Sequence, residues 1–125
     1  MRLLPDTQVY LWYLADSRKL STKASSEIAN AEDVFVSAAS IWEAAVKGAI
    51  GKLHAVADDL VAGIGASGFT ELPVSARHAA RVVTLPQHHR DPFDRLLVAH
   101  AVHEPLLLLT ADTALRRYSA LVVMV

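Results

Sequence analysis

The segment DPFDRLLVAHAVHEPLLLLTAD, residues 91–112, joins a predicted helix to a predicted buried strand. Asp91 and Pro92 are the residue types of a helix N-cap and first helical position, so a helix should begin here. It should run to about His103 and end before Pro105. LLLLT (106–110) is apolar throughout, as strands buried on both faces of a parallel sheet are. The segment therefore predicts one α-then-β step of a parallel sheet.

The rest of the chain alternates strands and helices in the same way. Strands are predicted at 2–5, 33–37, 69–74, 106–110 and 121–125, and helices at 7–15, 21–30, 40–50, 56–68, 75–83, 91–103 and 111–118. Ser40 and Glu43 have capping-box spacing at the start of the 40–50 helix, which Gly51 should end. We expect one domain over 1–125, a three-layer α/β/α sandwich with a central parallel sheet.

The composition excludes several classes of protein. The chain has 125 residues, 53% of them hydrophobic, which is enough for a core and argues against disorder. It has no cysteine, no apolar run long enough to span a membrane, and Asp6 interrupts the N-terminus too early for a signal peptide. We expect a cytoplasmic protein without membrane association. A net charge of −1 argues against a broad basic surface for nucleic acid.

Four acids are predicted to meet at one edge of the sheet. Asp6 follows the first strand and Asp112 follows LLLLT, whereas Glu43 and Asp94 lie in the first turns of helices that follow strands or loops. In open parallel sheets these positions share the edge where ligands bind. Each acid taken singly is also explained as a helix cap or a partner of the helix dipole. Taken together, four carboxylates would repel one another, and a hard cation such as Mg²⁺ would remove that repulsion.

Asp91 is interpreted mainly as the N-cap that Pro92 follows, with a water-bridged role beside a metal ion as the alternative. His100 and His103 share a helix face at a spacing that suits a metal, but no third partner is apparent and surface positions are expected. Trp12 and Trp42 have apolar neighbours, which favours the core or a dimer interface over base stacking.

Four segments resemble the successive motifs of PIN-domain proteins, and more narrowly those of VapC-type ribonuclease toxins of toxin–antitoxin pairs. They are LLPDTQVYLW (3–12), ASIWEAAVKGAIGKL (39–53), HRDPFDRLLVAHA (89–101) and LLTADTAL (108–115). The resemblance implies Mg²⁺ or Mn²⁺ held by carboxylates that fall onto Asp6, Glu43, Asp94 and Asp112. It also implies cleavage of single-stranded or loop RNA, a cognate antitoxin partner and a homodimer.

The resemblance extends to polar neighbours of the acids. Thr7 and Thr110 would support the site, and Gln8 stands where relatives often have His, Asn or Ser. Pro5 replaces the usual aliphatic residue. Arginine or lysine side chains would bind the substrate phosphates. The alternative for each of them is a solvent-exposed position without a role in binding. In order of preference these cations are Arg95, Arg116, Arg90 and Lys47.

Two other functions fit part of the pattern. A catalytically inactive PIN-like module that binds RNA or protein would have the same fold. A phosphoacceptor receiver domain would also have a parallel sheet and an acidic Mg²⁺ pocket. It would need paired acids after the first strand and a lysine after its last strand, but this chain has only Asp6 there and no lysine past Lys52.

Overall fold

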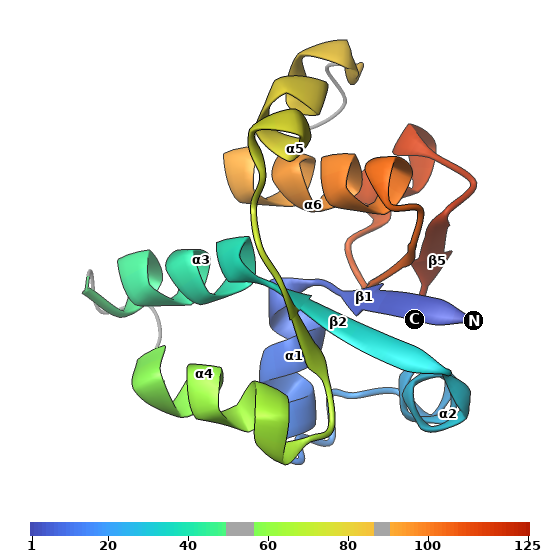
Figure 1. Cartoon of the computed structure of the whole chain (residues 1–125). Coiled ribbons are helices and arrows are strands. Elements are labelled where there is room, and N and C mark those ends of the chain that lie inside the picture. Colours follow the sequence, from blue (N-terminus) through green and yellow to red (C-terminus); the bar gives the residue numbers. More distant parts are fainter. Residues whose placement is uncertain (50–56, 87–90) are drawn as a thin grey trace.

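The computed structural model describes residues 1–49, 57–86 and 91–125, which form a five-stranded parallel sheet between layers of helices (Figure 1). The strands are β1 (Arg2–Pro5), β2 (Asp33–Ser37), β3 (Thr70–Leu72), β4 (Leu107–Thr110) and β5 (Val122–Met124). Their order is β3-β2-β1-β4-β5, with every neighbouring pair parallel. The order reverses between β1 and β4, and it differs from the 2-1-3-4-5 order of receiver domains. The receiver alternative is therefore excluded.

Helices connect the strands and were largely predicted from the sequence. They are α1 (Thr7–Leu14), α2 (Thr22–Asn30), α3 (Ala38–Ala49), α4 (Ala57–Ala66), α5 (Ala76–Arg81) and α6 (Pro92–His103), with 3-10 helices η1 (Val82–Thr84) and η2 (Thr113–Tyr118). The predicted last helix is thus a 3-10 helix. Gly51 and Val56, at the predicted end of α3 and start of α4, lie outside the described residues. None of the described helices has the length and apolar character of a membrane span.

Successive residues of the central strands point to opposite faces of the sheet. Leu4 and Leu108 belong to the apolar cluster beneath α6, whereas Leu3 and Leu109 belong to the cluster with α1 and α2. Figure 1 shows α5 and α6 on one side of the strands and α1, α2 and α4 on the other. The predicted three-layer sandwich is confirmed, and strands apolar throughout are explained by burial on both faces.

The predicted capping box at Ser40 and Glu43 is wrong. β2 runs directly into α3, which begins at Ala38, and the Ser37 hydroxyl accepts from the Ala39 amide at 2.9 Å, as an N-cap does. Ser40 lies inside the first turn, where its hydroxyl accepts from the Thr7 hydroxyl at 3.0 Å. Glu43 is consequently in the second turn of α3, and its carboxylate is not used as a cap.

Candidate metal centre

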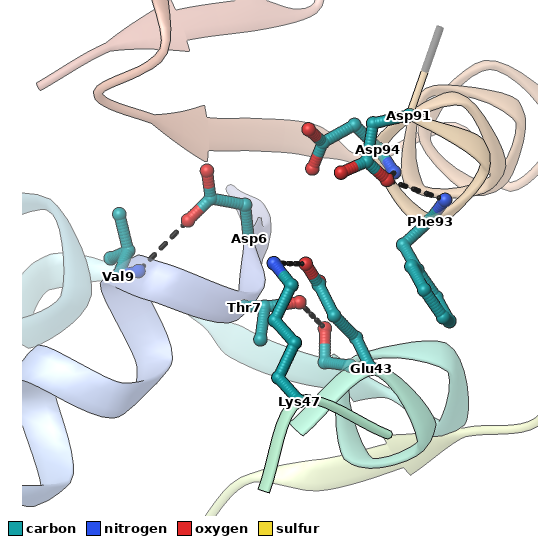
Figure 2. Close-up of polar contacts among 9 residues, drawn as sticks. Asp6, Thr7, Val9, Glu43, Lys47, Asp91, Phe93 and Asp94 are labelled. Carbon is teal, nitrogen blue, oxygen red and sulfur yellow. Dashed lines mark hydrogen bonds and ion pairs between the residues drawn. The ribbon is translucent and has the colours of Figure 1, made fainter. Parts of the chain in front are cut away.

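The four acids predicted to converge line one cleft at the point where the strand order reverses. The cleft has a volume of about 180 Å³ and is lined by Asp6, Thr7, Gln8, Leu11, Glu43, Lys47, Asp91, Asp94, Ala111 and Asp112. Figure 2 shows the side chains of Asp6, Glu43 and Asp94 approaching this space from the N-cap of α1, from α3 and from α6. Each acid comes from a different segment, so the cleft forms only when α3, α6 and the segments that follow β1 and β4 are packed together.

Asp6 caps a helix and faces the cleft at the same time. It is 6% exposed, and its Oδ1 accepts from the Val9 amide at 2.8 Å, which makes it the N-cap of α1. Its Oδ2 accepts from the Thr110 hydroxyl at 2.6 Å. Burial raises the pKa of Asp6 above its usual value, and the charges of Glu43 and Asp112 add to this. The two hydrogen bonds oppose the rise without cancelling it.

Glu43 is the most buried of the four acids, at 3% exposure. Its Oε2 is paired with the Lys47 ammonium, whereas its Oε1 is buried and has no hydrogen-bond partner within the described parts of the chain. A buried carboxylate oxygen without a partner is costly, so a cation or a water bound to one would satisfy it. This oxygen is the feature of the cleft that best fits a divalent ion.

The acids on the other side of the cleft are half-buried. Asp91 Oδ1 accepts from the amides of Phe93 and Asp94 at 2.8 and 3.2 Å, so its predicted N-cap role is confirmed. Asp112 caps η2, where Oδ1 accepts from the Ala114 amide at 2.9 Å. Asp94 lies in the first turn of α6 and lines the cleft. These carboxylates form an all-oxygen donor set of the kind that Mg²⁺ and Mn²⁺ prefer.

The polar neighbours divide into those that reach the cleft and those that position its acids. Thr7 and Gln8 line it, the first buried and the second exposed. Thr110 is fully buried, donates to Asp6 and accepts from the Asp112 amide at 3.0 Å. Thr110 therefore holds two of the acids in place and does not offer its hydroxyl to a substrate.

The preferred phosphate contact, Arg95, does not line the cleft. It is 8% exposed, and its guanidinium donates to the carbonyls of Pro86 and Val82 at 3.1 and 3.0 Å. Arg95 thus ties α6 to the preceding segment, because its side chain points into the fold. Arg116 is exposed on η2 but is also not part of the cleft lining. Arg90, His88 and His89 lie outside the described residues.

Lys47, the last choice among the predicted cations, lines the cleft. Its spacing from Glu43, four residues along α3, was the signal that could have placed it there. That signal is weak in sequence alone, since most such pairs lie on solvated helix faces.

The expectation that His100 is a surface residue is wrong. His100 is fully buried, its Nε2 lies 3.1 Å from the Ser37 hydroxyl, and its Nδ1 has no partner in the described structure. Burial, together with the neighbouring His78 and His103, lowers the pKa of His100 to about 4. The ring is therefore neutral near pH 7 and packs in the core between α6 and β2.

His103 is exposed as expected, but it lies in a cluster with His78 and Glu104 whose ligand atoms are within 4.8 Å of one another. Such a trio has the composition of a metal site. However, the Ser75 amide donates to His78 Nδ1 at 3.0 Å, so the proton of a neutral ring is on Nε2, 2.5 Å from Glu104. A metal on His78 Nε2 would break this arrangement, which instead fastens α5 to the end of α6.

The two tryptophans have different environments. Trp12 is partly buried and packs against the apolar cluster of α1 and α2, as expected for a core residue. Trp42 is 60% exposed on α3 and contacts Phe93 edge-on, with ring centroids 4.8 Å apart. Trp42 is therefore not a core residue.

The comparisons with known proteins agree with this fold. A search of curated proteins gave no match, but the PIN-domain family model matches residues 3–121. VapBC2 from Rickettsia felis, crystallised with promoter DNA, is 14% identical (99% of this chain, 97% of that one; TM-score 0.71). A Klebsiella pneumoniae toxin–antitoxin complex is 19% identical (98% and 96%; 0.69), and FitAcB from Neisseria gonorrhoeae is 20% identical (90% and 88%; 0.61). At these identities the structures support the fold alone, whereas the family model covers nearly the whole sequence: the chain belongs to the PIN-domain family.

Proposed function

We propose that the protein is a Mg²⁺- or Mn²⁺-dependent endoribonuclease and the VapC-type toxin of a type II toxin–antitoxin pair. The observation that carries this proposal is the meeting of Asp6, Glu43, Asp94 and Asp112 in one cleft, where the buried Glu43 Oε1 has no partner in the described structure. Membership of the PIN-domain family supports it. A helix-capping role does not account for Glu43, which lies in the second turn of α3.

The four acids would hold the divalent ion through carboxylate oxygens. When bound, such an ion activates a water for attack on a phosphodiester and neutralises the charge that develops on the phosphoryl group. The protein supplies fixed positions for the ligands. Thr110 and the Val9 amide hold Asp6, and Asp91 fixes the first turn of α6, from which Asp94 projects.

The polar rim of the cleft would orient the RNA. Gln8 is exposed there and carries both a donor and an acceptor, so it suits a phosphate oxygen or a metal-bound water. Thr7 lies beside it, with its hydroxyl directed to Ser40. We do not assign Arg95 to the substrate, because its guanidinium is buried against backbone carbonyls.

We further propose a cognate antitoxin, a homodimer and action in the cytoplasm. One of the similar structures, from Klebsiella pneumoniae, is a toxin–antitoxin complex, which supports an antitoxin partner here. The acidic cleft is a suitable surface for a cationic antitoxin segment. Co-purification with the product of the neighbouring reading frame tests the partner, and light scattering of the purified toxin tests the dimer.

The nuclease proposal is tested with labelled single-stranded and loop RNAs at saturating Mg²⁺. We expect Asp94→Asn to abolish cleavage, because it removes one carboxylate charge from the cleft with little change of shape. Asp58→Asn, on the exposed first turn of α4, is the matched control and should cleave like the wild type. Equal cleavage by both variants would contradict the proposal, and a wild type inactive on every RNA would favour the inactive binding module.

A further inference from the structure

Lys47 makes an ion pair with a buried carboxylate that also belongs to the cleft. Its ammonium contacts Glu43 Oε2 from one turn further along α3, and Figure 2 shows the pair beside Asp6. The side chains differ sharply in burial, with 36% of Lys47 exposed and 4% of Glu43. Most pairs with this spacing lie on solvated faces and contribute little. Here the carboxylate of Glu43 is buried, so the Lys47 ammonium compensates a charge that would otherwise be costly to bury.

The surroundings of Lys47 are strongly acidic. Burial alone lowers the pKa of its ammonium, but the hydrogen bond and charge of Glu43, with the charges of Asp91 and Asp94, more than offset this and raise it. Lys47 is therefore a fixed positive charge at any pH near neutrality. It shares the cleft lining with all four proposed metal ligands.

We propose that the Lys47 ammonium takes the place of the divalent cation in the metal-free protein and weakens the binding of that cation at the neighbouring Glu43 Oε1. This inference rests on the proposed function, because it takes the cleft to be the metal site. Without metal, the ammonium offsets the repulsion among the clustered carboxylates. The same ammonium, held on Glu43 Oε2, repels a divalent ion that binds to Oε1 of the same carboxylate. Lys47 thereby stabilises the empty protein at a cost in metal affinity.

The test is a calorimetric titration of metal-free protein with Mn²⁺, which reads binding without any RNA. We expect Lys47→Met to bind Mn²⁺ about tenfold more tightly than the wild type, because it removes a repulsion that corresponds to roughly 1.4 kcal/mol. Lys47→Arg keeps the charge and should bind no more tightly than the wild type. Lys23→Met, an exposed lysine on α2, makes the same change of charge away from the cleft and should behave like the wild type.

Thermal unfolding of the same proteins supplies a second measurement. In EDTA, Lys47→Met should unfold at a lower temperature than Lys23→Met, because Glu43 is left buried without its cation. Saturating Mn²⁺ should raise its midpoint by more than it raises that of the wild type. If Lys47→Met does not fold, Lys47→Gln, which keeps a hydrogen-bond donor, is measured in its place.

The outcomes separate the two proposals. Equal Mn²⁺ affinity in Lys47→Met and Lys23→Met would overturn the role of Lys47 and leave the nuclease proposal standing. A wild type that shows no saturable Mn²⁺ binding, or binding that Asp94→Asn leaves unchanged, would overturn both. Tighter binding confined to the variants that lose the charge at position 47 would support the inference.

Discussion

At the scale of single residues, the acids of the cleft combine a structural with a chemical role. Asp6 caps α1 through Oδ1 and accepts from Thr110 through Oδ2, yet its pKa is raised by burial and by neighbouring acids. Asn or Ser would cap the helix as well as Asp does. The carboxylate therefore has an electrostatic cost that an amide at this position would avoid, which is expected of a group that serves a function.

Asp6→Asn should accordingly stabilise the metal-free protein while abolishing cleavage. Because the pKa of Asp6 is raised on folding, the folded state holds the proton to higher pH than the unfolded chain does. The ionised group thus opposes folding at neutral pH, and this penalty disappears as pH falls below its unfolded pKa. Thermal unfolding in EDTA should show a higher midpoint for Asp6→Asn at neutral pH and a smaller gain in acid. A variant less stable than wild type at both pH values would contradict this.

His100 should make stability fall in mild acid. Burial, with His78 and His103, lowers its pKa to about 4, whereas the unfolded chain takes up the proton near pH 6.5. The unfolded state therefore binds more protons between these values, and stability is lost as pH falls through that window. From neutral pH to about pH 5, the wild type should lose roughly 2 kcal/mol more than His100→Gln in urea unfolding. Parallel losses in both proteins would show that His100 does not titrate in this way.

At the scale of elements, the sequence predicts helices and strands well but places their ends less well. Both Ser37 and Ser40 can cap a helix, and only the path of β2 into α3 selects Ser37. The strand LLLLT could be predicted because a strand buried on both faces is apolar at every position. Whether η2 is a 3-10 or an α-helix depends on packing, which residue types alone do not specify.

The two glycines of α4 are a matched pair that tests its packing. At Gly63 a Cβ would lie 2.9 Å from Leu14 Cδ1 and 3.0 Å from the Tyr10 hydroxyl, which is held by a 2.7 Å bond to the Leu60 carbonyl. At Gly65 a Cβ would meet nothing within 4 Å. We expect Gly63→Ala to destabilise the protein by about 1–3 kcal/mol and Gly65→Ala to stabilise it by up to ~1 kcal/mol. Denaturant unfolding measures both, and a gain from Gly63→Ala would show that α1 and α4 are less closely packed.

At the scale of the whole molecule, the strand order brings the acids together. β1 and β4 are neighbours although about a hundred residues separate them, so Asp6 and Asp112 leave the sheet side by side. A parallel sheet predicted from sequence was enough to expect this edge. The predicted sheet did not show which cations reach the cleft, because the burial of Arg95 depends on the path of the segment through Val82 and Pro86. Lys47 was likewise ranked last, because the sequence does not show that its partner Glu43 is buried.

The dependence of RNA cleavage on a divalent ion tests the central claim most directly. Wild-type protein is mixed with a panel of labelled single-stranded and loop RNAs, first in EDTA and then after an excess of Mg²⁺ is restored. The convergence of four carboxylates predicts that cleavage is absent in EDTA and returns with Mg²⁺. Cleavage at an equal rate in EDTA, or no cleavage of any RNA with Mg²⁺ or Mn²⁺ present, would contradict it.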